Sequence, residues 1–187
     1  MGPISTKPRL LLFQPPIYDF ALFDLFLKPY GLLRLGRWFE EDGYDVFFVN
    51  GLDYNEAVTN KALGSPRRYS NGTGKFPRMR TSLPRGVEYN ERSFGRYGVL
   101  QDILKNKIKD INPDLIFITS GMTYWYKGVV EAVQISKELF PDIPVLVGGI
   151  YANLMPEHCK ASSGADHVVC GDTEKTIKTI LKKYSLP

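Results

Sequence analysis

The chain has 187 residues, of which 43% are hydrophobic and 24% are charged, and its formal net charge is +4. This length suits one domain with a sizeable core, and the composition is that of an ordinary globular protein. The sequence contains no apolar run near the roughly 18 residues of a membrane helix, and residues 1–9 lack the apolar core of a signal peptide. The two cysteines, at positions 159 and 170, match no zinc-binding spacing. We therefore expect a single cytoplasmic domain without a membrane partner.

Short apolar runs alternate with amphipathic stretches along the chain, which is the pattern of a parallel sheet with helical crossovers. The expected strands are Arg9–Gln14, Asp45–Asn50, Asp114–Thr119, Pro144–Val147 and His167–Cys170. The expected helices are Pro29–Asp42, Val99–Asn112, Tyr126–Phe140, Pro156–Ser163 and Thr173–Tyr184. Right-handed crossovers then predict an α/β, flavodoxin-like (Rossmann-like) three-layer sandwich. Its five-stranded parallel sheet would have the order 2-1-3-4-5.

One connection, residues 51–98, is far longer than usual. It is rich in Gly, Pro, Ser and Asn, and it carries nine Lys or Arg residues against four acids. We predict an insertion with little regular structure, in which Lys61 to Arg96 is ordered mainly by a partner domain. Two interpretations stay open: a solvated surface segment, and a docking surface for another domain or a phosphate-bearing group. Its interleaved aromatics would also suit single-stranded nucleic acid, but a nucleic-acid motif is missing and such a partner is not expected.

Three loops follow the first, third and fourth strands, at Gln14–Asp19, Ser120–Thr123 and Gly148–Tyr151. In an open α/β sheet, ligands bind outside the carboxyl ends of the strands, near the point where the strand order reverses. Two consecutive glycines allow a sharp turn and the close approach of a ligand, although they also suit a plain strand-to-helix turn. The hydroxyls after the third strand suit a polar ligand group, and they equally suit a helix cap. Together the loops predict a ligand site.

Aromatic residues gather in the same loops. Tyr18, Phe20, Phe23 and Phe26 follow the first strand, and residues 124–126 read Tyr-Trp-Tyr. So many apolar side chains would form an exposed patch on a lone domain, which favours a large apolar ligand or a second domain. The alternative is that they pack within their own domain.

These segments resemble the cobalamin-binding domain of cobalamin-dependent radical S-adenosylmethionine enzymes, from about Arg9 to Glu174. The resemblance is carried by PPIYDF, KPYGLLRLGRWFEEDGYDV, GTGKFP, TSGMTYWYKGV, FPDIPVLVGGIYANLMPEH and SGADHVVCGDTE. It implies that cobalamin lies over the carboxyl edge of the sheet, with its nucleotide tail beside Ser120 and Gly149. The cobalamin-binding residues that it implies are Pro16, Ile17, Tyr18, Ser120, Gly121, Met122, Thr123, Gly148, Gly149, Tyr151 and Gly171.

The sequence departs from the family pattern in two places. Many cobalamin domains carry a cobalt-ligating histidine after the first strand, whereas Phe20 and Ala21 follow Asp19 here. His158 and His167 read as a helix-surface and a strand-end residue, so base-off, histidine-off cobalamin is expected and a metal ligand from this chain is not. The Gly-Glu-Gly-Glu segment of the family is replaced by residues 171–174, Gly-Asp-Thr-Glu.

The resemblance also implies a partner. A cysteine triad for a four-iron four-sulfur cluster is absent from the sequence. The cluster and S-adenosylmethionine are therefore expected only in a downstream barrel domain of the same protein, and this chain alone is not expected to be catalytic.

Two other classes remain open. One is a small flavodoxin-like domain that binds a nucleotide or another phosphate ligand, although neither a Gly-x-Gly-x-x-Gly nor a Walker loop follows the first strand. The other is a receiver-like signalling domain, although Thr119 and Ser120 stand where an aspartate would end the third strand.

Overall fold

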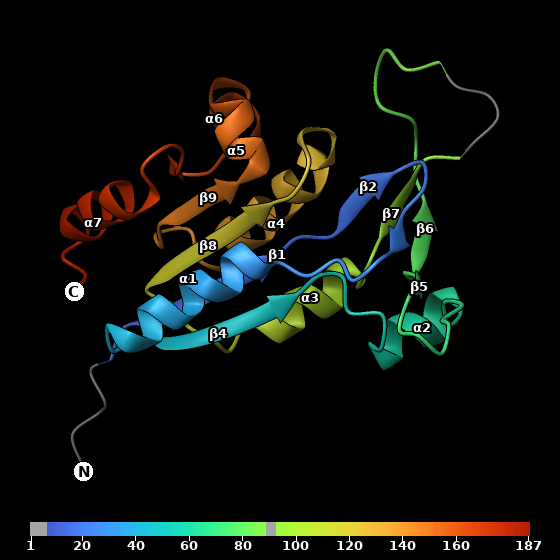
Figure 1. Ribbon diagram of the computed structural model, residues 1–187, viewed down its shortest axis with the longest axis horizontal. Helices are drawn as coiled ribbons and strands as arrows, with labels where there is room; N and C mark the ends of the chain where they lie inside the picture. The colour runs from blue at the N-terminus through green and yellow to red at the C-terminus, as the bar shows by residue number, and fades with distance from the viewer. Residues whose placement is uncertain (1–6, 89–92) are drawn as a thin grey trace, which may run out of the picture.

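The computed structural model describes residues 7–88 and 93–187. Its central sheet is parallel and has the order β10-β9-β8-β1-β4 (Figure 1). The strands are β1 (Arg9–Gln14), β4 (Asp45–Asn50), β8 (Leu115–Ser120), β9 (Val145–Gly149) and β10 (His167–Val168). Numbered along the chain, this is the order 2-1-3-4-5, so the predicted flavodoxin-like fold is confirmed. The fifth strand is two residues shorter than predicted.

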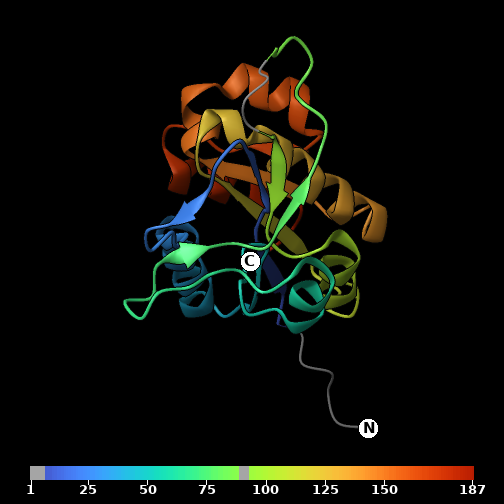
Figure 2. The same ribbon diagram turned by 90° about the vertical axis from the view of Figure 1, so that its right-hand side faces the viewer.

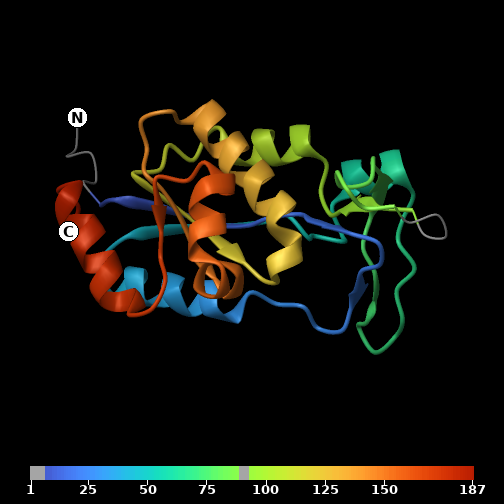
Figure 3. The same cartoon turned by 90° about the horizontal axis from the view of Figure 1, so that it is seen from above.

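Helices cover both faces of the sheet and make the three layers visible in Figure 3. On one face lie α1 (Tyr30–Glu41) and α7 (Thr173–Lys183), and on the other lie α3 (Gln101–Ile108), α4 (Tyr126–Leu139) and α6 (Pro156–Ser163). Helix α3 is shorter than the predicted helix, since it ends at Ile108 and is followed by a turn that leads to Asn112, which has a φ of 47°. The short helices η1 (Thr123–Trp125) and α5 (Ile150–Leu154) were not predicted.

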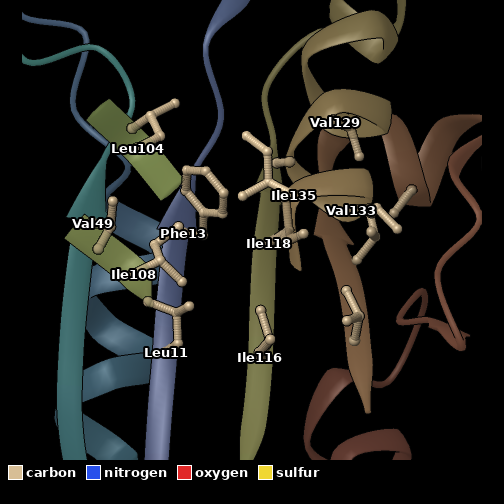
Figure 4. Close-up of a cluster of buried hydrophobic side chains, with 14 of the residues drawn as sticks. Leu11, Phe13, Val49, Leu104, Ile108, Ile116, Ile118, Val129, Val133 and Ile135 are labelled. Atoms are coloured by element: carbon tan, nitrogen blue, oxygen red, sulfur yellow. The ribbon is translucent and has the colours of Figure 1, made fainter. Parts of the chain in front are cut away.

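Successive side chains along each strand point to opposite faces of the sheet, and they fill two separate cores. Leu11 and Phe13 of β1 point to the α3/α4 side, whereas Leu10 and Leu12 point to the α1/α7 side. Figure 4 shows Phe13 and Ile118 within the first of these cores. Strands buried on both faces read as continuous apolar runs, which is why the sequence predicts them well.

The prediction of little regular structure in residues 51–98 is wrong. This segment contains α2 (Ala57–Leu63), β5 (Gly74–Lys75), β6 (Arg78–Arg80) and β7 (Gly95–Tyr97). They pair with two short strands from the loop after β1, β2 (Ile17–Asp19) and β3 (Phe23–Asp24), in the antiparallel sheets β2-β7-β6 and β3-β5. We call the described part of residues 17–28 and 51–98 the edge lobe. It lies beyond the carboxyl ends of β1 and β4 and faces the viewer in Figure 2.

A buried ion pair joins the edge lobe to the main domain. The Arg96 guanidinium on β7 donates to both carboxylate oxygens of Glu131 on α4, at 2.6–3.1 Å, and both residues are buried. The Tyr18 hydroxyl donates to the same carboxylate at 2.7 Å. Burial, followed by the negative charge of Glu131, raises the pKa of this phenol well above its usual range. The three side chains fix β2 and β7 against α4.

Apolar packing supports the same junction. Ile17, Leu52, Phe76 and Tyr97 form a small buried cluster inside the edge lobe. On α4, a Cβ at Gly128 would lie 1.8 Å from the Pro16 carbonyl oxygen, so the helix and the loop after β1 are in close backbone contact. Part of the segment that we expected to depend on a partner domain therefore has its packing within this chain.

We predict that Arg96→Ala lowers the free energy of unfolding by about 3–5 kcal/mol, because it leaves the Glu131 carboxylate buried without its cation. Urea denaturation of the purified chain measures this loss. Arg37→Ala is the control, since the Arg37–Glu41 pair on α1 is exposed, and it should cost less than about 1 kcal/mol. Equal effects of the two substitutions would contradict the role given to the buried pair.

Candidate functional site

A cleft of about 710 Å³ opens on the α1/α7 side of the sheet. It runs over β8 and β9, which lie between α1 and α7 in Figure 1. Its volume is in the range of sites for small molecules and cofactors, about 300–1,000 Å³. One end is at the carboxyl edge, beside Gly149 and Asn153, and the lining continues along α1 as far as Glu41.

The cleft combines an apolar wall with polar groups. The apolar lining consists of Leu32, Leu35, Trp38, Phe117 and Val169. The polar lining includes Arg34, Thr119, Asn153, Thr173 and Glu174. An apolar, partly aromatic wall with a few polar groups is typical of sites that hold a small molecule or cofactor and fix its orientation.

The two glycines after β9 are needed for the shape of this edge. A Cβ at Gly148 would lie 2.8 Å from the Phe117 ring. Gly149 has a φ of 100°, and a Cβ there would lie 2.4 Å from the Ser120 carbonyl oxygen. Both glycines line the cleft. Glycine is thus required at both positions because β9 packs closely against β8. A side chain at Gly149 would disturb the fold even in the absence of a ligand.

Hydrogen bonds tie the loops after β8, β9 and β10 together. The buried Ser120 hydroxyl donates to the Gly148 carbonyl at 2.6 Å and accepts from the Ala152 amide at 3.3 Å. The Asn153 side chain donates to the Gly149 carbonyl and accepts from the Gly171 amide, both at 2.9 Å. Ser120 lines neither the cleft nor the hollow described next. In this structure it positions the glycine turn.

A smaller hollow of about 90 Å³ lies at the carboxyl ends of β1 and β8. Pro16, Ile17, Gly121 and Trp125 contribute to its lining. Thr119 lines both this hollow and the cleft, so the two spaces adjoin at the end of β8. The Trp125 indole donates to the Asp19 carboxylate at 2.8 Å, which holds η1 against β2. At the switch point of the sheet, the lining of the hollow is therefore fixed by the hydrogen bond between Trp125 and Asp19.

The structure divides the predicted cofactor-binding residues into three groups. Gly148 and Gly149 line the cleft, and Pro16, Ile17 and Gly121 line the hollow. The remaining six lie around these spaces without lining them: Tyr18, Ser120, Met122, Thr123, Tyr151 and Gly171.

Tyr151 and the two histidines are engaged in ring contacts. Tyr151 is buried, and its hydroxyl lies 2.7 Å from Nδ1 of the exposed His158. Burial raises the pKa of this phenol to about 12. The His167 ring packs edge-on against Tyr184. In the part of the chain that the structure describes, three or more His, Cys, Asp or Glu residues nowhere gather as a metal site would require.

Sequence reasoning missed the contribution of α1 and of the strand residues that point toward it. Trp38, Phe117 and Thr119 line the cleft. Each of them does so because its side chain points into this space, and a sequence motif does not mark any of the three. The available signal was periodicity, because Leu35 and Trp38 lie three residues apart on one helical face.

Exposed apolar side chains surround the carboxyl edge. We call Leu25, Phe26, Met122, Tyr124, Ile150 and Leu154 the apolar rim, and they are 40–71% exposed. Of the aromatics predicted to form a patch, Phe23 and Phe26 are exposed, whereas Tyr18 is half-buried and bound to Glu131. Part of the loop after β1 therefore forms an exposed apolar patch, and another part packs within its own domain. Among the described helices, none is both long and apolar enough to cross a membrane.

Part of the chain resembles known proteins in sequence. Residues 90–181, or 92 of the 187 residues, match the family model described as "B12 binding domain". Over 82 residues, or 43% of the chain, the sequence is 30% identical to the anaerobic magnesium-protoporphyrin IX monomethyl ester cyclase of Rubrivivax gelatinosus. The match spans 15% of that protein.

A solved structure shares the fold. The novel cobalamin-binding protein from Desulfitobacterium hafniense DCB-2 superposes with a TM-score of 0.51 and 16% identity, over 96% of this chain and 59% of that one. The chain therefore has the α/β fold of a cobalamin-binding domain, and the match of residues 90–181 supports that assignment.

We predict that Gly149→Ala destabilises the protein by at least about 1–2 kcal/mol, because an L-residue is strained at positive φ and its Cβ would meet Ser120. Gly31→Ala is the matched control on α1, since a Cβ at Gly31 meets nothing within 4 Å. Removing a helical glycine should raise stability by roughly 0.5–1 kcal/mol. Thermal unfolding of both variants measures the difference, and a neutral Gly149→Ala would show that the turn can relax.

Proposed function

We propose that this chain is the cobalamin-binding domain of a radical S-adenosylmethionine enzyme and holds base-off, histidine-off cobalamin at the carboxyl edge of its sheet. The observation that carries the proposal is the cleft of about 710 Å³, which starts at that edge and continues between α1 and α7. Base-off cobalamin extends a nucleotide tail with an aromatic base away from the corrin ring. A deep slot with an apolar wall suits such a tail.

The residues present fit the tail. Trp38 and Phe117 supply aromatic surface inside the cleft, and Arg34 and Thr173 supply polar groups for the ribose and phosphate. Gly149, at the edge, keeps the entrance free of a side chain. The corrin ring would then lie across the carboxyl edge, against the apolar rim.

Three features of the chain support the histidine-off part of this proposal. The loop after β1 is held by Tyr18 and Trp125 and carries no histidine. His158 has its Nδ1 within hydrogen-bond distance of Tyr151, and His167 lies on β10. These positions support a cobalt without an imidazole from this chain.

A second domain would complete the site. The apolar rim stays exposed in this chain, and apolar patches of this kind mark interaction surfaces. The chain spans 15% of the anaerobic cyclase that it matches, which supports a longer parent protein. In that parent, cobalamin, a four-iron four-sulfur cluster and S-adenosylmethionine would supply the chemistry, while this domain orients the corrin ring.

A second candidate is a flavodoxin-like domain for a nucleotide or another phosphate ligand. One observation favours it: Arg34 lines the cleft, and in the described part of the chain it has no ion-pair partner. Titration with FMN and ATP separates the candidates, because only this second one predicts binding that cobalamin does not displace.

We predict that the chain binds cob(II)alamin in the base-off form, without nitrogen coordination from the protein. An axial nitrogen splits the electron paramagnetic resonance lines of cob(II)alamin, so the bound spectrum should lack this splitting. Splitting that disappears in His158→Ala or His167→Ala would contradict the histidine-off assignment. Failure of the chain to take up any corrinoid would contradict the proposed function itself.

We predict that Trp38→Ala weakens cobalamin binding by about 1–3 kcal/mol, the usual effect of losing an aromatic ring that stacks on a base. Leu33→Ala is the control on the same helix, since Leu33 is 41% exposed and does not line the cleft. Equilibrium titration gives both affinities, with circular dichroism to confirm folding. Binding of cobinamide, which lacks the nucleotide, should not depend on Trp38.

A further inference from the structure

The wall of the cleft at the start of α7 has little packing of its own. Thr173 and Glu174, in the first turn of this helix, line the cleft. The structure describes all of residues 170–176, and none of them is buried. Burial resumes at Ile177, from which point α7 packs into the core on the α1/α7 side of the sheet. Something other than apolar packing therefore holds this end of the cleft wall.

A side chain from α5 supplies the missing tie. Within the described chain, one hydrogen bond joins residues 170–172 to another element, and in it the Gly171 amide donates to Oδ1 of Asn153 at 2.9 Å. The other hydrogen bonds of this segment stay within the first turns of α7. The Lys175 amide donates to the Asp172 carboxylate at 3.1 Å, and the Thr176 amide donates to the Asp172 carbonyl at 3.0 Å.

Asn153 connects two glycine turns across the mouth of the cleft, which it also lines. Its Nδ2 donates to the Gly149 carbonyl at 2.9 Å, while its Oδ1 accepts from Gly171. Gly149 and Gly171 both have a positive φ, at 100° and 69°. A carboxamide can donate and accept at once, whereas the carboxylate of an aspartate could only accept. The planar side chain of Asn153 therefore fixes the spacing between the loops after β9 and β10.

We propose that Asn153 is a positioning residue that holds the α7 wall of the cleft in place and makes the site selective for corrinoids with a nucleotide tail. This inference rests on the proposed function, in which the tail enters this cleft. A wall that is already ordered costs less conformational entropy on binding than one that the ligand has to order. The corrin ring would lie on the apolar rim instead, so the loss of Asn153 should affect the tail alone.

The test is an equilibrium titration of the 187-residue chain and its variants with hydroxocobalamin and with cobinamide, which lacks the nucleotide. Asn153→Ala and Asn153→Leu both remove the bonds to Gly149 and Gly171, and leucine is similar to asparagine in size. Each variant should weaken cobalamin binding about 3- to 10-fold and leave cobinamide binding within about twofold of wild type. A general loss of stability would weaken the binding of both ligands alike.

The control is Asn106→Ala, because Asn106 is exposed on α3 and lines neither the cleft nor the hollow. It should leave both affinities unchanged. Equal cobalamin affinity of wild type and the two Asn153 variants would overturn the positioning role while leaving the proposed function intact. So would an equal loss for cobalamin and cobinamide. A wild-type chain that binds no corrinoid would overturn the positioning role together with the proposed function.

Amide hydrogen exchange of the wild-type chain, followed by NMR, decides the question if circular dichroism shows that the variants fail to fold. The Gly171 amide should exchange more slowly than the amides of Cys170 and Asp172, after correction for intrinsic rates, because it donates to Asn153. Bound cobalamin should slow exchange across residues 170–176, and cobinamide should not. Equal exchange of the three amides in the free chain, or equal slowing by the two ligands, would overturn the inference.

Discussion

The ion pair between Arg96 and Glu131 is the interaction on which the architecture of the ligand-binding edge depends. A carboxylate buried on α4 needs a cation, and β7 of the edge lobe supplies it. Because the Tyr18 hydroxyl binds the same carboxylate, β2 and β7 are held in one position over the ends of β1 and β4. The loop after β1 is therefore a fixed wall, and it leaves the ends of β8 and β9 as the open part of the edge.

The cleft is a consequence of how the sheet is covered. Helices α1 and α7 pack on the same face, yet a space of about 710 Å³ stays between them over β8 and β9. Gly148 and Gly149 contribute by allowing β9 to pass β8 closely before α5 begins. The hollow at the end of β1 adjoins this space at Thr119, so the cleft and the hollow are neighbouring parts of the same edge.

The strands were predictable from sequence because burial on both faces makes each one a run of apolar residues, as in β1 and β8. The turn at Gly148 and Gly149 was predictable because two consecutive glycines after an apolar run indicate a sharp turn. The edge lobe was not, because its strands have only two or three residues and two of its pairings join distant segments, as Ile17 with Tyr97 and Phe23 with Lys75. The role of Ser120 was equally hidden. A hydroxyl at a strand end suggests a ligand contact, whereas here it accepts from α5 and donates to β9.

The basic composition of the edge lobe shows why charge alone is a poor guide to function in this chain. Two of its arginines have partners within the fold: Arg96 pairs with Glu131, and Arg68 pairs with Asp24 while its guanidinium lies 3.6 Å from the Tyr54 ring centroid. Such groups have partners and need no ligand. The cleft and the hollow instead adjoin at Thr119, at the carboxyl end of β8. Position at the carboxyl ends of the strands, rather than net charge, is therefore the better guide to a ligand site on this sheet.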